Sequence, residues 1–190
     1  MVQVLGFAVL VLVSGWADGR AYTSMISVAN GGASGKWYAI QLCPDRIYAR
    51  GFSVKVDTPQ GIGDDTGLNG IRLICTGPKR KKSKTIHSAT LRWGAWTADS
   101  WCPAGVLRSF SLRVQPWQGV FGDSTGANNI RFRCSDGSAI EGRGGSLGDY
   151  GGWSESCKKG ICGIQTRAQP PQGFRDDTGV NDVRFLCCND

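Results

Sequence analysis

The sequence predicts an all-β protein built from three repeated units around a pseudo-threefold axis. Three observations carry this prediction. The motif D-[DS]-T-G-x-N-x-[IV]-R-[LF]-x-C occurs three times along the chain. The chain holds 28 glycines among 190 residues, about twice the usual share, which favours turns over long helices. No stretch has helical periodicity, whereas several short stretches alternate between apolar and polar residues.

Each copy of the motif joins a polar turn to a short strand. Asp, Asn, Thr and Gly form turns because their side chains bond the local backbone or because glycine accepts positive φ. The β-branched and aromatic residues that follow are typical of a strand. Thr66 to Thr125 is a shift of 59 residues, and Thr125 to Thr178 is a shift of 53. Such a period predicts a repeat architecture.

The remainder of each unit repeats as well, with a first strand, a Gly-x-Trp or Gly-Trp element, a cysteine and an alternating strand. We expect units of about 20–77, 78–135 and 136–190, each forming one four-stranded sheet. Three such sheets would bury their apolar faces against one another. The expected core residues are Trp37, Trp96, Trp153, Phe52, Phe110 and Ile164, whereas the tryptophans without counterparts, Trp93, Trp101 and Trp117, are candidates for the surface or for a site.

The first 19 residues are predicted to be a secretory signal peptide. Residues 1–17 carry no charge, Val4 to Val13 is an apolar run, and small residues follow it. The run is too short to span a membrane. We therefore expect a single secreted domain over residues 20–190, extracellular and without membrane insertion.

The eight cysteines predict a disulfide framework, which fits a secreted chain. Because repeated sequence implies repeated geometry, each unit should form its own bridge, and the two cysteines left over should pair. The expected disulfides are Cys43–Cys75, Cys102–Cys134, Cys157–Cys187 and Cys162–Cys188. The alternative is a metal site with Cys157, Cys162, Cys187 and Cys188 as ligands; we expect no metal and no cofactor.

The formal net charge of +7 predicts acidic extracellular partners, such as mucin-type glycoproteins or acidic glycans. Nucleic acid is excluded as a partner by the predicted compartment and by the absence of a recognition motif. A dense basic run separates the first two units. It is either an exposed, solvated connection or a polyanion-binding site formed by Lys79, Arg80, Lys81, Lys82 and Lys84.

The sequence offers no convincing catalytic site. His87 is the only histidine, so a Ser-His-Asp triad is not supported. Glycoside hydrolysis needs two carboxyl groups across a sugar site, and Glu141 and Glu155 are the weak candidates for it. The repeated turns carry polar residues that either build the turns or bind sugar hydroxyls: Asp65, Asn69, Asp123, Asn128, Asp177 and Asn181.

The repeated motif, the spacing of Trp, Cys and Phe, and the closing Phe185-Leu186-Cys187-Cys188 resemble the vitelline membrane outer layer protein I family. The resemblance covers about Tyr22 to Asp190. It implies a β-prism of three four-stranded Greek-key sheets and secretion. It also implies association with mucin-type glycoprotein, because the founding member is a component of the outer egg envelope.

From these observations we expect a monomeric, secreted, non-catalytic component of an extracellular coat or mucosal secretion that associates with glycans. Two alternatives stay open. One is a carbohydrate-active protein, a lysozyme-like transferase or hydrolase that acts on N-acetylglucosamine glycans. The other is a host-defence lectin.

Overall fold

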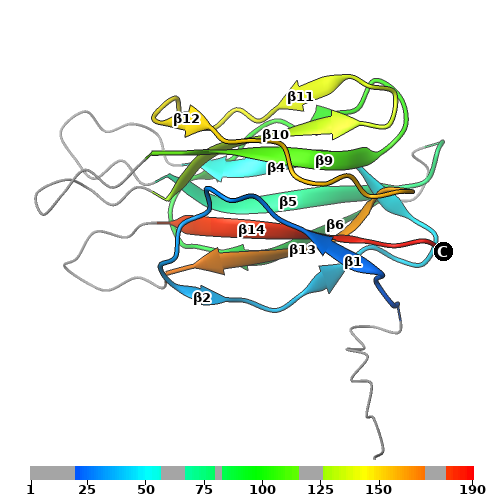
Figure 1. Cartoon of the computed structure of the whole chain (residues 1–190), viewed down its shortest axis with the longest axis horizontal. Helices are drawn as coiled ribbons and strands as arrows, with labels where there is room; N and C mark the ends of the chain where they lie inside the picture. The colour runs from blue at the N-terminus through cyan, green and yellow to red at the C-terminus, as the bar shows by residue number, and fades with distance from the viewer. Residues whose placement is uncertain (1–19, 57–66, 80–82, 116–125, 170–178) are drawn as a thin grey trace, which may run out of the picture.

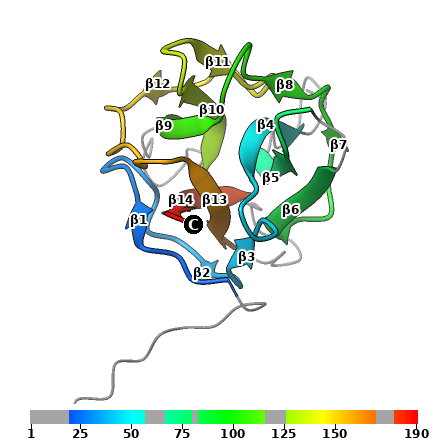
Figure 2. The same cartoon turned by 90° about the vertical axis from the view of Figure 1, so that its right-hand side faces the viewer.

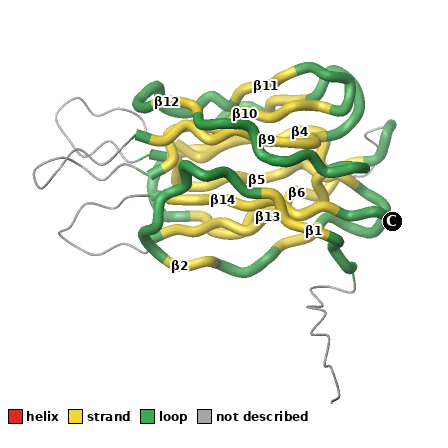
Figure 3. Tube along the Cα trace, in the orientation of Figure 1, coloured by secondary structure: helices red, strands yellow, loops and turns green. Residues whose placement is uncertain are grey.

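The computed structural model describes residues 20–56, 67–79, 83–115, 126–169 and 179–190. All regular elements among them are strands, as Figure 3 shows, so the described part has no helix that could cross a membrane. The longest strands run along the long axis of the molecule in Figure 1. Viewed along that axis, three antiparallel sheets form the sides of a prism (Figure 2). The predicted all-β, pseudo-threefold β-prism is confirmed.

A long hairpin forms the centre of each sheet, and its second strand is the tail of one motif copy. Side chains alternate along these strands, so the apolar positions face inward and the positions between them face outward. The three hairpins are β4 (Tyr48–Val56) with β5 (Leu68–Thr76), β9 (Leu107–Val114) with β10 (Ala127–Cys134), and β13 (Ile161–Ala168) with β14 (Val180–Cys187).

Shorter strands flank each hairpin in the same order. The β4–β5 sheet adds β6 (Ser83–Thr90), β7 (Ala95–Trp96) and β8 (Ser100–Trp101). The β9–β10 sheet adds β11 (Ala139–Glu141) and β12 (Asp149–Tyr150). The β13–β14 sheet adds β1 (Ser24–Ile26), β2 (Lys36–Trp37) and β3 (Gln41–Leu42). In each sheet the four main strands follow the Greek-key order.

The sheets do not coincide with the repeat units, contrary to the expectation of one sheet per unit. Each hairpin pairs with flanking strands from the following unit, and the last hairpin pairs with β1, β2 and β3 from the start of the chain. The third Greek key is therefore assembled from both ends of the sequence. The reason is that strand pairing depends on which edges meet in space, and the sequence period does not report this.

The disulfides follow the expected pairs but join different sheets. Cys43 donates its backbone N–H to Cys162 of the β13–β14 sheet and is bridged to Cys75 in β5. The equivalent bridges Cys102–Cys134 and Cys157–Cys187 join the next sheets around the axis, and Cys162–Cys188 links neighbouring segments of one sheet. Three of the four cystines therefore form a ring that holds the three sheets together.

The core lies on the pseudo-threefold axis and is dominated by phenylalanines. Phe132 is fully buried, and its ring centroid lies 4.6 Å from that of Phe52, 5.1 Å from Phe185 and 6.3 Å from Phe110. These rings come from all three hairpins. Phe52, Phe110 and Ile164 are fully buried, as the sequence predicts.

The ends of the described chain are tied together beside this core. Arg20 is only 3% exposed, and its Nη1 donates to the carbonyl oxygens of Cys43, Pro44 and Ile47 at 2.7–3.1 Å. Its Nη2 forms an ion pair with Asp190 at 2.6 Å. Because a buried guanidinium needs hydrogen-bond partners, this arrangement holds the first described residue against the last.

Candidate functional site

The three repeated asparagines are buried at the ends of the hairpin strands. Asn69, Asn128 and Asn181 are 1%, 3% and 4% exposed. The strands that carry these asparagines begin close to one another. Gly67 lies so near the carbonyl oxygen of Ala127 that a Cβ atom at this position would collide with it. This burial favours the turn-building interpretation of the asparagines over sugar binding. The repeated aspartates, Asp65, Asp123 and Asp177, lie outside the described residues.

Only two members of the basic run lie within the described part of the chain. Lys79 and Lys84 are exposed, whereas Arg80, Lys81 and Lys82 lie outside it. Lys84 belongs to β6 and lines a polar hollow of about 240 Å³ together with Arg20 and Asp45.

The two glutamates singled out as carboxylate candidates are not joined by any contact. Glu141 lies on β11, where its Oε1 accepts hydrogen bonds from the Tyr150 hydroxyl at 2.8 Å and from Asn129 Nδ2 at 3.3 Å. Burial and this hydrogen bond to Glu141 raise the pKa of Tyr150. The Glu155 carboxylate is exposed and has no hydrogen-bond or ion-pair partner among the described residues. Glu141 is therefore a surface carboxylate that is tethered by its neighbours, whereas Glu155 is not.

The repeated tryptophans are not in the core, so that prediction is wrong. Trp37 pairs with Arg167 across β2 and β13, and Trp96 pairs with Lys55 across β7 and β4. Both are half-buried on the outer face of their sheets, because residues at these register positions point away from the axis. Trp93 is 48% exposed, as expected for a surface position, and Trp117 lies outside the described residues. Trp101 is half-buried on β8.

In the third unit, Tyr150 occupies the position of these tryptophans, and Trp153 does not. Tyr150 pairs with Arg113 just as Trp96 pairs with Lys55. The glycines two positions earlier also match, since Gly35, Gly94 and Gly148 have φ values of 81°, 80° and 77°. The sequence carried a signal for this register: a Gly-x-aromatic element, which Gly148-Asp149-Tyr150 satisfies and Gly152-Trp153 does not.

The arginine of each motif copy stacks on this repeated aromatic residue. The guanidinium carbon of Arg184 lies 3.7 Å from the ring centroid of Trp37, that of Arg72 lies 4.7 Å from Trp96, and that of Arg131 lies 4.2 Å from Tyr150. Such cation–π contacts are attractive and hold the guanidinium plane in place. Sequence reasoning missed these arginines, although each recurs between two buried apolar positions and must therefore face outward.

The β9–β10 sheet carries the longest of these stacks. Arg113 and Arg131 lie 4.6 Å and 4.2 Å from the Tyr150 ring, and Arg131 and Arg133 lie 4.8 Å and 4.4 Å from the Trp153 ring. We call this row the arginine–aromatic strip, in the order Arg113, Tyr150, Arg131, Trp153, Arg133. It runs over the outer surface of β9 and β10.

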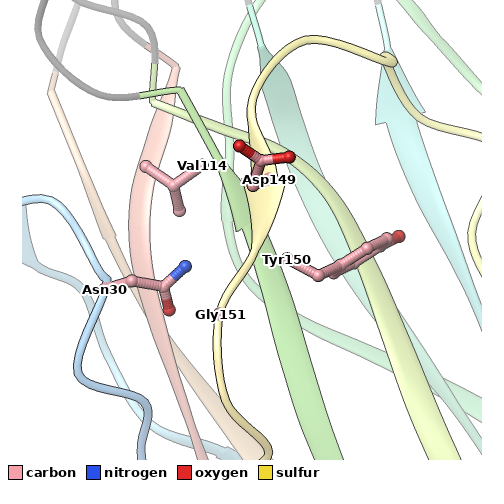
Figure 4. A pocket seen from close by; sticks show the side chains of 5 residues that line it. All are labelled: Asn30, Val114, Asp149, Tyr150 and Gly151. Carbon is pink, nitrogen blue, oxygen red and sulfur yellow. The ribbon is translucent and has the colours of Figure 1, made fainter.

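A small pocket opens beside one end of the strip. Its volume is about 360 Å³, and Figure 4 shows the residues that line it: Asn30, Val114, Asp149, Tyr150 and Gly151. The Tyr150 ring points away from Asn30 and Val114. Asn30 Nδ2 donates to the carbonyl oxygen of Leu112 at 2.9 Å, so the loop between β1 and β2 is pinned against the β9–β10 sheet here.

Comparisons with known proteins agree with this architecture. The chain is 54% identical over 170 residues to the vitelline membrane outer layer protein 1 homolog of Mus musculus, which covers 88% of this chain and 84% of the relative. It is 50% identical over 175 residues to the homolog of Homo sapiens, covering 90% and 86%.

Two solved lectin structures share the fold. Artocarpin in complex with mannopentose matches with a TM-score of 0.55 and 12% identity over 88% of this chain and 98% of artocarpin. Calsepa lectin in complex with a bisected glycan matches with a TM-score of 0.56 and 16% identity over 90% and 99%. At these identities the likeness concerns the fold. Residues 24–190 match the family described as vitelline membrane outer layer protein I, and the chain therefore belongs to this family.

Proposed function

We propose that the protein is a secreted, non-catalytic component of an extracellular coat or mucosal secretion, where it binds acidic glycans of mucin-type glycoproteins. The observation that carries this proposal is the set of stacked arginines on the outer faces of the prism. Arg131 and Arg133 form no ion pair within the described residues, whereas the charge of Arg184 acts on the nearby Asp182 carboxylate. Guanidinium groups that are held in place and form no ion pair with the protein attract anionic ligands.

Two further observations support the proposal. The four disulfides suit an extracellular protein. The relatives from mouse and human carry a name that refers to the vitelline membrane outer layer, a coat of this kind.

The test is binding of the mature protein to immobilised mucin at two salt concentrations. We expect binding that weakens as salt rises, because screening reduces attraction between exposed charges. The basic run is tested by a variant in which Lys79, Arg80, Lys81, Lys82 and Lys84 are replaced by Gln. A clear loss of mucin binding in this variant would show that the run contributes to binding. Absence of mucin binding at both salt concentrations would refute the proposed function.

The pocket lined by Asn30 and Asp149 favours a second candidate, a lectin for a neutral sugar. Its volume of about 360 Å³ suits a small ligand, and the Asp149 carboxylate can accept hydrogen bonds from sugar hydroxyls. Saturable binding of one neutral sugar on a glycan array, unchanged by salt and lost in Asp149→Asn, would support this candidate over the first.

The enzyme alternative predicts a different readout. Incubation with chito-oligosaccharides should leave their lengths unchanged if the protein is non-catalytic. A change in chain length that disappears in Glu141→Gln or Glu155→Gln would overturn the non-catalytic part of the proposal.

A further inference from the structure

The three outer faces of the prism are not equivalent, and the differences gather on the β9–β10 sheet. The motif copies read Arg72-Leu73-Ile74, Arg131-Phe132-Arg133 and Arg184-Phe185-Leu186. Ile74 and Leu186 are 3% and 0% exposed, whereas Arg133 at the same position is exposed. A repeat needs equal residues for its architecture, so a residue present in one copy alone points to a role that only this face has.

The second unit-specific residue is Trp153. Tyr150 already fills the repeated aromatic position, so Trp153 is an additional ring. It lies between Arg131 and Arg133, at 4.8 Å and 4.4 Å from their guanidinium carbons. The extra arginine and the extra ring therefore extend the same row, and together they lengthen the stack found on the other two faces.

The arginines of this strip form no ion pair among the described residues, although Glu141 is the register partner of Arg131 on β11. Arg72, the equivalent on the β4–β5 sheet, is paired with Asp99 at 3.1 Å and also donates to Ser53. By contrast, the side chains of Arg131 and Arg133 form no ion pair and no hydrogen bond within the described part. The nearby Glu141 is engaged by Tyr150 and Asn129 instead of by an arginine.

Stacking on the rings uses none of the guanidinium hydrogen-bond donors, although Arg113 Nη1 also donates to the carbonyl oxygen of Ser146 at 2.9 Å. Stacking on Tyr150 and Trp153 restricts the Arg131 plane, and the Nε of Arg131 and of Arg113 is buried without a partner. A guanidinium carries five donors in a fixed fork that matches oxyanions. Because the side chains are already ordered, a ligand loses little further entropy in ordering them.

We propose that the arginine–aromatic strip binds sulfate ester groups along a glycan chain. This inference rests on the proposed function and names the face and the chemical group that it uses. Arg131 and Arg133 are two residues apart on β10, which places their backbones roughly 6–7 Å apart. A sulfate ester has more terminal oxygens than a carboxylate, so it can accept from neighbouring forks at once. A row of guanidinium groups fits a chain that carries such esters at intervals.

The test compares binding of a heparin oligosaccharide of defined length to two double variants by titration calorimetry. Arg113→Gln/Arg133→Gln removes the ends of the strip, and Lys158→Gln/Lys159→Gln removes the same charge from an exposed segment elsewhere. We expect the strip variant to bind at least about 10-fold more weakly, and the control to stay within about threefold of the unmodified protein. The slope of log affinity against log salt should fall by about one for each lost contact.

The conservative variant Arg133→Lys tests whether binding needs the planar guanidinium group or only its positive charge. It should weaken binding while leaving the salt slope near that of the unmodified protein, because an ammonium keeps the charge but loses the planar fork. Thermal unfolding of each variant checks that the fold is retained, and Arg133→Leu, which carries the residue found at Leu186, provides a second variant for the same position.

Three outcomes are decisive. If the strip variant and the control variant bind the oligosaccharide equally weakly, the strip is not the binding site. Binding by the unmodified protein would then still support the proposed function. Equal affinity for the heparin oligosaccharide, for its desulfated form and for polysialic acid would overturn the preference for sulfate. Lack of binding to the heparin oligosaccharide, with mucin binding retained, would also refute the strip and leave the broader function in place.

Discussion

Arg184 stacks on the indole ring of Trp37, with 3.7 Å between the guanidinium carbon and the ring centroid. The two residues belong to β14 and β2, which come from the last and the first repeat unit. The contact lies on the sheet that is assembled from both ends of the chain. It therefore reports on closure of the prism, because the β13–β14 hairpin is flanked only when the N-terminal strands have docked.

Removal of the Trp37 ring should weaken this closure. We expect Trp37→Ala to lower the free energy of unfolding by about 1.5–3 kcal/mol, from lost apolar burial and the lost cation–π contact. Trp93→Ala is the matched control, since Trp93 is 48% exposed and should lose less than about 1 kcal/mol. Guanidinium denaturation followed by circular dichroism measures both values. Similar losses in the two variants would contradict a role of Trp37 in closure.

Phe132 is the residue on which the core depends most. Its ring contacts those of Phe52, Phe110 and Phe185, so Phe132→Ala should cost about 3–5 kcal/mol of folding free energy. Phe132→Leu introduces leucine, which the first motif copy carries at the equivalent position as Leu73. This change should lower the free energy of unfolding by less than about 2 kcal/mol. If the two variants lose the same amount in denaturant unfolding, the cavity explanation does not hold.

Peptide mapping should find every repeated cystine within one repeat unit. Trypsin separates Cys157 from Cys162 at Lys158 and Lys159, but the adjacent Cys187 and Cys188 stay on one peptide. Partial reduction and alkylation must therefore distinguish Cys157–Cys187 from Cys157–Cys188. We expect removal of Cys102–Cys134 by a double Cys→Ala change to cost about 3–4 kcal/mol in the chain-entropy model. A bridge found between units would contradict the ring of cystines.

Asp182 should make stability depend on pH. Burial raises its pKa, and the Val183 N–H, Arg167 and Arg184 oppose this only in part. An acid with a raised pKa in the folded state binds more protons when folded, so stability falls as pH rises from about 4 through the folded pKa. Asp182→Asn, which places the residue of Asn129 there, should therefore raise stability near pH 7 by up to about 1 kcal/mol and change it little near pH 3.

The control for this prediction is Asp99→Asn, which removes the ion pair with Arg72. A partly exposed pair contributes about 0–1 kcal/mol, so this variant should lose a little stability near pH 7. Thermal unfolding at both pH values measures the difference. A loss of stability for Asp182→Asn near pH 7 would show that the Asp182 charge is stabilising and would contradict its predicted effect.

Local chemistry made much of the fold, but little of the candidate site, predictable from the sequence. The turn residues, the alternating strands and the cysteine spacing depend on neighbouring residues, and the all-β repeat, Phe52 and Phe110 in the core and the cysteine pairs all follow from them. The tryptophans were misplaced because a large apolar side chain predicts burial, whereas stacking on an arginine lets it cover an outer face. Tyr150 was missed because the number of residues between the aromatic residue and the following cysteine differs in the third unit from that in the first two.

The sequence by itself determined the threefold repeat, its turns and strands, and the disulfide framework, because repeated residues impose repeated local geometry. Only the tertiary structure decided which strands share a sheet, since pairing between units depends on closure of the whole chain. Pairing of β12, from the third unit, with β9 of the second brings Tyr150 and Trp153 into one row with Arg113, Arg131 and Arg133. Such a sheet face combines a hairpin from one unit with a short strand from the next, so it cannot be recognised from the sequence of either segment alone.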